Sequence, residues 1–390
     1  MKKIKLIFSV LSRANYARVK SVIKKSIESE IIEPIVVIGC SALSKDYGNI
    51  IEECGKENII IHEKISSLMH EKSRENMVKT TALGMLDFSN ILSKYKPDIG
   101  LTVADRYETI SFAIACSYMG IPLIHLQGGE PTGCIDDKVR NSISQLSDYH
   151  FVCSKDAYSR TLKWGEPKNR IFNVGCPSLD HINLKNRNQI KECIELLNLK
   201  YKTNINPKKD YLVFLYHPDT NKFSQDFNVV LTPLILASKK LNANLVIIQP
   251  NSDAGSSEIV ESLKILKNQN NNVSKFEKLN IDYVNHLTSS EYITLLQGCK
   301  VLVGNSSSGI REGSFLGISV VNIGERQRFR LKPENVYNVD LNSEAILDTI
   351  VKAFNRKSVK RYFDYGDGNS SSKIINIIEK LEISIKSTKI

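Results

Sequence analysis

The sequence predicts an α/β protein built from two Rossmann-like, doubly wound domains, and three observations support this fold class. The chain has 390 residues, so two domains are expected rather than one core. Short apolar runs alternate with helical patterns, which is typical of βαβ units and a parallel sheet. Polar stretches at 173–188 and 197–210 separate two such alternating series.

The elements follow from these runs in order. The first series predicts strands at 3–10, 33–39, 98–104, 121–127 and 149–154, separated by helices that include 14–28, 74–95 and 107–119. The second series predicts strands at 211–218, 244–250, 301–305 and 319–324. We therefore expect domains at 1–180 and 181–365. An amphipathic helix at 366–390 is expected to pack back on the first domain.

Composition narrows the class of protein. The chain is 42% hydrophobic and 24% charged, which is typical of globular proteins and not of disordered or collagen-like chains. The apolar run after Lys2 and Lys3 reads as a strand rather than a signal peptide. No run approaches the roughly 20 apolar residues that span a bilayer. Eight scattered cysteines without a Cys-x-x-Cys pair indicate a cytoplasmic protein without a structural metal.

The formal net charge of +11 has three interpretations: nucleic-acid binding, a small anionic substrate, or a lysine-rich solvated surface. The lysines are spread along the chain, and no basic stripe interleaved with aromatic residues is present. We therefore expect no nucleic-acid partner, and the charge alone does not identify a ligand.

Polar side chains follow the ends of several predicted strands, where open parallel sheets bind ligands. These residues also have interpretations without a functional role. The serines after the strand at 301–305 could cap a helix, Asp105 and Arg106 could form a surface ion pair, and His217 could be a loop residue. Their shared location nevertheless predicts a nucleotide or phosphosugar site. The residues concerned are Arg13, Asp105, Arg106, His217, Asn251, Ser306, Ser307 and Ser308.

The glycine-rich stretch "LQGGEPTGCIDD" brings several carboxylates to one strand-to-helix turn. Gln127 ends the strand and Glu130 lies in the turn, while Asp136 is expected in the first turn of the next helix, where the helix dipole favours a carboxylate. Strict alternation along 121–127 predicts that His125 and Gln127 point the same way.

The motifs "SRANYARVK", "ADRYE", "GGEPTGCIDDKVRNSISQLS", "FNVGCPSLD", "YHPDTN", "PNSDAGS", "GNSSSGIREGSFLGISVVNIGERQ" and "YGDGNSS" occur in this order over nearly the whole chain. Together they resemble the hydrolysing UDP-N-acetylglucosamine 2-epimerases of sialic-acid-type sugar biosynthesis. The resemblance implies a glycosyltransferase-B-like fold with the active site in the interdomain cleft. It also implies no metal, no cofactor and a homodimer or homotetramer.

The resemblance further implies a reaction. The nucleoside diphosphate is eliminated to leave a 2-acetamidoglucal, and water then adds to release a C2-inverted sugar. Asp105 and Asp136 occupy positions of catalytic acids. His217 is implied both in catalysis and in nucleotide binding. The residues implied to hold the nucleotide are Arg13, His217, Ser306, Ser307, Glu312 and Arg326, and Arg106 and Asn251 are expected to assist them.

Two positions depart from the family pattern. Gln127 stands where a catalytic Glu is usual, and Asn15 replaces an Asp. A neutral amide cannot accept a proton near pH 7. Either Glu130 or Asp136 supplies the base, or Gln127 accommodates a substrate altered near C4, or the protein is inactive. The resemblance implies that the substrate is UDP-GlcNAc or a UDP- or GDP-linked 2,4-diacetamido-2,4,6-trideoxyglucose (diacetylbacillosamine) on the route to legionaminic acid. A glycosyltransferase and a non-catalytic nucleotide-sugar sensor are the alternative functions.

Overall fold

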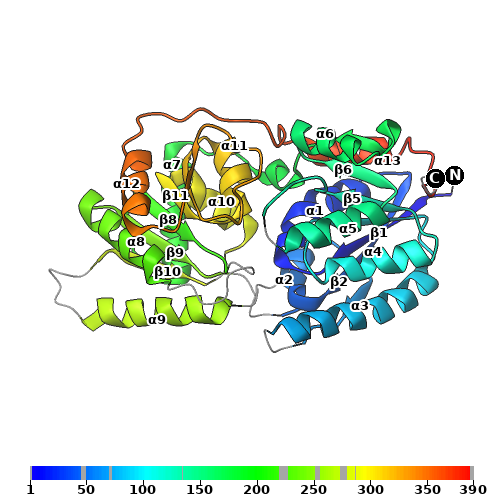
Figure 1. The fold of residues 1–390 in the computed structure, drawn as a ribbon, viewed down its shortest axis with the longest axis horizontal. Helices are drawn as coiled ribbons and strands as arrows, with labels where there is room; N and C mark the ends of the chain where they lie inside the picture. Colours follow the sequence, from blue (N-terminus) through cyan, green and yellow to red (C-terminus); the bar gives the residue numbers. More distant parts are fainter. Residues whose placement is uncertain are drawn as a thin grey trace. The chain divides into compact units, whose positions relative to one another are not determined.

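The computed structural model describes residues 2–44, 50–69, 73–133, 135–218, 227–250, 255–272, 279–285 and 287–386. The chain divides into two compact units (Figure 1). Unit 1 comprises Met1–Pro131, Ile135–His181 and Asp364–Ile390, and unit 2 comprises Thr132–Cys134 and Ile182–Phe363. Each unit contains one parallel sheet with helices, which confirms the predicted fold class of two Rossmann-like units.

Unit 1 is built on a seven-stranded parallel sheet in the order β3-β2-β1-β4-β5-β6-β7. The chain winds outward in both directions from β1 and β4, so the order reverses between these two strands. Loops leaving the carboxyl ends of such a pair diverge and leave room for a ligand. The strands are β1 (Ile4–Val10), β2 (Ile32–Gly39), β3 (Glu63–Ile65), β4 (Ile99–Val103), β5 (Leu123–Leu126), β6 (Tyr149–Val152) and β7 (Ile171–Asn173).

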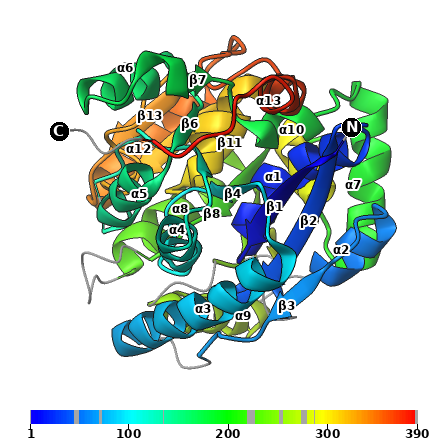
Figure 2. The same ribbon diagram turned by 90° about the vertical axis from the view of Figure 1, so that its right-hand side faces the viewer.

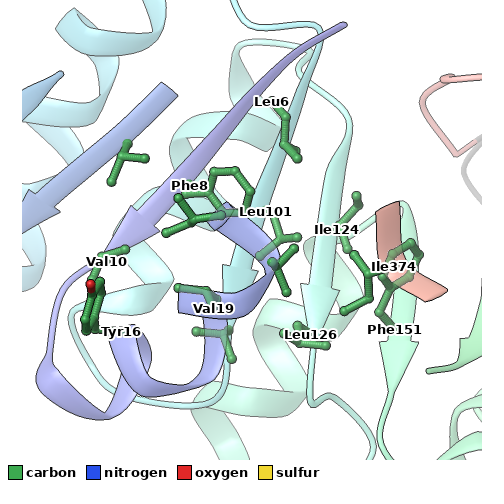
Figure 3. Close-up of a cluster of buried hydrophobic side chains, with 14 of the residues drawn as sticks. Leu6, Phe8, Val10, Tyr16, Val19, Leu101, Ile124, Leu126, Phe151 and Ile374 are labelled. Carbon is green, nitrogen blue, oxygen red and sulfur yellow. The ribbon is translucent and has the colours of Figure 1, made fainter. Parts of the chain in front are cut away.

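Helices cover both faces of this sheet (Figure 2). Helices α1 and α13 contribute apolar side chains to one core cluster, and α3, α4 and α5 contribute to the cluster on the other face. Figure 3 shows the first cluster, in which Tyr16 and Val19 of α1 and Ile374 of α13 meet side chains from β1, β4, β5 and β6. The helices of unit 1 are α1 (Arg13–Ile27), α2 (Ile50–Lys56), α3 (Arg74–Tyr95), α4 (Thr109–Tyr118), α5 (Asp136–Leu146), α6 (Lys155–Lys163) and α13 (Ser370–Ile378).

Unit 2 repeats this arrangement with six parallel strands in the order β10-β9-β8-β11-β12-β13, which reverses between β8 and β11. Its strands are β8 (Tyr211–Leu215), β9 (Asn244–Ile248), β10 (Ile281–Val284), β11 (Val301–Gly304), β12 (Ser319–Ile323) and β13 (Val336–Val339). Its helices are α7 (Arg187–Tyr201), α8 (Asn228–Leu241), α9 (Ser256–Asn272), α10 (Ser289–Gly298), α11 (Ser314–Leu316) and α12 (Ser343–Phe354), with a π-helical turn η5 (Gly309–Gly313) before α11.

The strands predicted in both units and the three helices predicted in the first series are confirmed, whereas the outer strands β3, β7, β10 and β13 were not predicted and the C-terminal helix differs from the prediction. The tail was expected to be helical over 366–390, whereas α13 covers only Ser370–Ile378. Residues 381–386 form no regular element and contact unit 1 through side chains instead: Ser384 N donates to Tyr149 Oη at 2.9 Å, and Lys386 Nζ lies 3.2 Å from Glu166 Oε2. In the described part of the chain, no helix combines the length and apolar character needed to cross a membrane.

Candidate active site

The carboxyl edge of the sheet in unit 1 brings together several predicted site residues. Arg13 is the first residue of α1, directly after the Ser12 cap that ends the β1 loop. Asp105 and Arg106 follow β4, and Gln127 follows β5. Because β1, β4 and β5 are neighbours in the sheet, these four residues lie along one edge, beside the point where the strand order reverses.

The backbone at this edge is strained at two neighbouring strand ends. Ala104 has φ 68° and Gln127 has φ 69°, in the left-handed region that residues with a Cβ rarely adopt. Several other left-handed residues, such as Lys96 and Lys202, are ordinary helix C-caps. Ala104 and Gln127 instead turn the chain sharply at the ends of β4 and β5. Such strain is concentrated at functional sites, where the surrounding structure holds it.

Arg140 of α5 is the centre of the polar contacts at this edge. Its side chain is only 1% exposed and forms ion pairs with Asp105 and with Asp137, the latter at 2.6 Å between Nη1 and Oδ1. Nη1 also donates to the main-chain carbonyl of Glu130. The buried guanidinium therefore joins the β4 end, the glycine-rich turn and the first turn of α5, and it holds the Asp105 carboxylate, which keeps 14% exposure.

The other two carboxylates of the glycine-rich turn are placed differently. Asp136 is half-buried in the first turn of α5, a position at which acidic side chains interact favourably with the helix dipole. Glu130 is 4% exposed, and its charge acts on His125. Asp105, Glu130 and Asp136 thus lie on the end of β4, the glycine-rich turn and the start of α5, which Arg140 links together. Asp137 forms an ion pair with Arg140.

Gln127 is buried, at 2% exposure, and its amide Nε2 donates to Cys176 Sγ at 3.1 Å. The thiol in turn contacts Ser178 Oγ at 3.0 Å. His125 has other partners, Ser144 of α5 and the carbonyl of Ala104. The prediction that His125 and Gln127 point the same way is wrong, because the left-handed φ of Gln127 breaks the strand alternation at the residue after β5.

Arg106 forms an ion pair with Glu108, with 2.7 Å between Nε and Oε1. Arg106 is 12% exposed and Glu108 1%, so the pair is largely buried. The alternative of a surface pair between Arg106 and Asp105 is wrong, because Asp105 is taken by Arg140 and Arg106 by the carboxylate two residues along.

In unit 2, His217 follows β8 and is joined to the end of β11 by a reciprocal clamp. Its main-chain N donates to Asn305 Oδ1 at 2.7 Å, and Asn305 Nδ2 donates back to the His217 carbonyl at 2.8 Å. Gly304, with φ 146°, precedes Asn305, and a Cβ there would collide with the Leu215 carbonyl. The backbone of His217 is therefore fixed where the strand order of this sheet reverses, and its imidazole does not take part in the clamp.

The serines after β11 form a short hydrogen-bonded series. Ser306 Oγ lies 3.0 Å from Ser308 Oγ, which lies 2.6 Å from Tyr292 Oη. Ser307 is half-buried beside them, at the start of the helical segment that continues into η5. π-helical turns of this kind are frequent at functional sites. The main-chain N–H groups at such a helix start favour an anion.

Two buried acceptors lie in the next part of unit 2. Glu312 Oε2, in η5, and Gln327 Oε1, after β12, are buried oxygens with no hydrogen-bond partner among the residues that the structure describes. Arg326 is half-buried next to Gln327. Buried acceptors of this kind are unusual without a partner, so both fit a ligand that donates hydrogen bonds. Asn251 lies outside the described residues.

Sequence reasoning gave no role in these sites to four residues that the structure places there: Arg140, His125, Asn305 and Gln327. Arg140 had a signal, because it lies three residues after Asp137 on a predicted helix, where opposite charges meet. The other three had none. His125 is a single polar residue in an apolar strand, and Gln327 lies among charged residues that read as a solvent-exposed loop. The clamp of Asn305 depends on a strand far along the chain.

Comparison with known proteins agrees with this architecture. The sequence model of the family described as UDP-N-acetylglucosamine 2-epimerase matches residues 24–379. A UDP-N,N'-diacetylbacillosamine 2-epimerase (hydrolyzing) of Legionella pneumophila is 30% identical over 379 residues, covering 97% of this chain and 96% of that protein. A GDP/UDP-N,N'-diacetylbacillosamine 2-epimerase (hydrolyzing) of Campylobacter jejuni is 33% identical over 322 residues, covering 82% of this chain and 79% of that protein.

Solved structures share the fold at low sequence identity. The UDP-GlcNAc 2-epimerase of Methanocaldococcus jannaschii, in complex with UDP-GlcNAc and UDP, superposes with a TM-score of 0.79 at 15% identity, over 97% of this chain and 100% of that one. The Neisseria meningitidis enzyme bound to UDP-GlcNAc gives a TM-score of 0.76 at 16% identity, over the same shares. With the family match over residues 24–379, these findings place the chain in the UDP-N-acetylglucosamine 2-epimerase family.

Proposed function

We propose that the chain is a hydrolysing nucleotide-sugar 2-epimerase. The observation that carries the proposal is the Asp105 carboxylate, held at the strained end of β4 by a buried arginine, in a chain of this family. A positioned carboxylate with partial exposure is suited to proton transfer. The proposed enzyme needs no cofactor, acts as a homo-oligomer and works in the cytoplasm.

The reaction has two steps. A base removes the C2 proton while the C1–O bond breaks and the nucleoside diphosphate leaves with the bonding electrons, which forms the C1=C2 bond of a 2-acetamidoglucal. Water then adds its oxygen to C1, and a proton reaches C2 from the opposite face. Positive charge develops at C1 in both steps, so carboxylates near the sugar lower the barrier. Asp105, Glu130 and Asp136 are the proposed proton-transfer and charge-stabilising residues.

Unit 2 is proposed to hold the nucleotide. The imidazole of His217 and the helix start at Ser306 and Ser307 are suited to the diphosphate, since both provide donors or positive charge. The buried Glu312 Oε2 is suited to accept from ribose hydroxyls. Arg326, Arg13 and Arg106 add positive charge for the leaving group, with Asn251 assisting.

We propose a UDP- or GDP-linked 2,4-diacetamido-2,4,6-trideoxyglucose, on the route to legionaminic acid, as the first substrate to test, with UDP-GlcNAc as the second. The names of the Legionella and Campylobacter relatives support the first choice. Gln127 supports it too, because an amide both donates to and accepts from an N-acetyl group, whereas the carboxylate usual at this position only accepts.

Gln127→Glu is expected to lower kcat/KM on the diacetamido substrate and to raise any activity on UDP-GlcNAc. The physical reason is that a carboxylate cannot donate a hydrogen bond to the N-acetyl group of the diacetamido substrate. It also cannot donate to Cys176 Sγ, as the Gln127 amide does at 3.1 Å. Steady-state kinetics on both sugars measure the change. Gln145→Glu, the same substitution at an exposed position of α5, is the control. If Gln127→Glu accelerates turnover of every nucleotide sugar, the substrate-reading role is wrong.

His217→Ala is expected to weaken UDP binding and to slow turnover by at least about tenfold, since a lost contact to a charged group is worth roughly 1.5–3 kcal/mol. The substitution should leave the local backbone unchanged, because the two hydrogen bonds between the His217 main chain and the Asn305 side chain do not involve the imidazole ring. Titration calorimetry with UDP measures the affinity. His62→Ala in unit 1 is the control, and unchanged affinity in His217→Ala would remove His217 from the site.

The proposed function is tested by offering purified protein each nucleotide sugar without an acceptor. Anion-exchange chromatography follows the nucleotide, and NMR follows the sugar. Release of nucleoside diphosphate together with a free manno-configured sugar is expected, and it should be lost in Asp105→Asn. Release only after an acceptor is added would indicate a glycosyltransferase. Binding of the nucleotide sugars without release would indicate a sensor.

A further inference from the structure

Two consecutive carbonyls at the end of β4 are held by side chains from neighbouring elements. Asn15 Nδ2 of α1 donates to the Val103 carbonyl at 3.2 Å, and the ring Nε2 of His125 in β5 lies 2.9 Å from the Ala104 carbonyl. Asn15 is 1% exposed and His125 fully buried. Ala104 is the left-handed residue directly before Asp105. The last peptides before Asp105 are thus fixed from two elements.

The protonation of His125 follows from its two partners. A carbonyl only accepts, so Nε2 must carry the ring proton that it donates to Ala104. Burial lowers the pKa of His125 to about 4, so the ring is neutral under ordinary conditions and Nδ1 is an acceptor. Ser144 Oγ, 2.9 Å away, therefore donates to Nδ1. The Ser144 hydroxyl selects the tautomer that can bind the Ala104 carbonyl.

The glycine after Gln127 leaves space for this arrangement. A Cβ on Gly128 would lie 2.9 Å from His125 Nδ1 and 2.7 Å from Ser144 Oγ, closer than real Cβ contacts. The glycine-rich turn therefore has a second use besides bending toward a ligand: it leaves room for the His125–Ser144 pair. This links the turn, α5 and the end of β4 through one buried ring.

We propose that His125, oriented by Ser144, is a positioning residue that holds Ala104 in its left-handed conformation and thereby directs Asp105 onto Arg140. Alanine does not favour this conformation, so the peptide needs an external hold to keep it. Asn15 is the second hold. Its amide donates to Val103, which the Asp usual at this position in the family pattern could not do. The catalytic consequence rests on the proposed function of Asp105.

The kinetic test compares three variants. His125→Phe keeps the ring volume and removes the donor, and kcat is expected to fall at least about tenfold while UDP affinity stays within about twofold. His125→Gln retains an amide donor and should recover part of the loss. Ser144→Ala removes the hydroxyl that donates to His125 Nδ1, so the ring tautomer is no longer fixed, and an intermediate kcat is expected. Equal kcat in wild type and all three variants would overturn the proposal.

A matched control comes from the neighbouring strand. His150 pairs in register with His125 and is also buried. Its Nε2 lies 3.0 Å from the Glu166 carboxylate, whereas Nε2 of His125 lies against the carbonyl of Ala104 at the end of β4. His150→Phe should lower stability without lowering the kcat of the folded protein. If His150→Phe and His125→Phe reduce kcat equally, the effect is general loss of packing and the proposal is wrong.

A structural measurement separates this proposal from the proposed function. Crystal structures of wild type and His125→Phe should show Ala104 leaving the left-handed region and the Asp105 carboxylate moving away from Arg140. Should His125→Phe fail to fold, Ser144→Ala serves in its place. Unchanged Ala104 and Asp105 would contradict the positioning role. A wild type that releases no nucleotide from any sugar would contradict the proposed function, while the crystal structures still decide the role of His125.

Discussion

Asp105→Asn is expected to lower kcat by a factor of about 10²–10⁴, the contribution typical of a positioned proton-transfer group. The substitution preserves size but removes both the proton acceptor and the charge that pairs with Arg140. The UDP dissociation constant should change by less than about threefold, because the proposed UDP contacts are made mainly by unit 2. Single-turnover kinetics and calorimetry with UDP separate the two effects.

The neighbouring carboxylates provide the controls for Asp105. Asp137→Asn removes the other carboxylate that pairs with Arg140. It should lower the free energy of unfolding but change kcat little, because the Asp137 carboxylate is bound to Arg140 Nη1 at 2.6 Å. Asp136→Asn should depress kcat as Asp105→Asn does. Near-normal turnover in Asp136→Asn together with a large loss in Asp137→Asn would move the catalytic assignment by one residue. Near-normal turnover in Asp105→Asn would refute the proposed centre of the site.

Arg140→Met is expected to reduce the free energy of unfolding by about 3–5 kcal/mol and to abolish most turnover. Methionine fills much of the same space, but it leaves the Asp105 and Asp137 carboxylates and the Glu130 carbonyl without their buried cationic partner. Urea denaturation measures the loss of stability. The loss of turnover follows because the Asp105 carboxylate is no longer held in place.

Arg160→Met is a matched control for Arg140. Arg160 makes the same kinds of contact, an ion pair to Asp156 at 2.9 Å and a bond from Nη1 to the Gly129 carbonyl at 2.6 Å. Its side chain is 31% exposed, so solvent compensates for the lost charge, and the cost should be about 1 kcal/mol. Equal destabilisation by the two substitutions would mean that burial of Arg140 is not what makes it important.

The central strands could be predicted from sequence because both faces of a parallel sheet are covered, so β1, β4, β8 and β9 read as nearly continuous apolar runs. The outer strands β3, β7, β10 and β13 were missed. They have three or four residues and mixed burial, which leaves too short a pattern to separate from a loop. The C-terminal helix was overextended because an amphipathic pattern does not show where tertiary bonds to Tyr149 replace helical ones.

The location of candidate residues at strand ends was predictable, as for Asp105, His217 and Ser306, which follow β4, β8 and β11. Their partners were not. The pairing of Asp105 with Arg140 instead of Arg106 depends on where α5 lies against the sheet. The direction of Gln127 depends on a left-handed φ at a residue with a Cβ, which no sequence pattern announces. The sequence therefore predicted that the candidate residues lie at the carboxyl ends of strands, and the structure supplied their hydrogen-bonded arrangement.

The most direct test of the proposed function is the isotope content of the released sugar. The protein is incubated in D₂O with the UDP- and GDP-linked diacetamido sugars and with UDP-GlcNAc, and C2 of the product is examined by NMR. Elimination followed by addition of water predicts deuterium at C2 of a free, C2-inverted sugar, with nucleoside diphosphate as the other product. A free sugar that keeps its C2 proton and its gluco configuration would show simple hydrolysis and contradict the epimerase proposal.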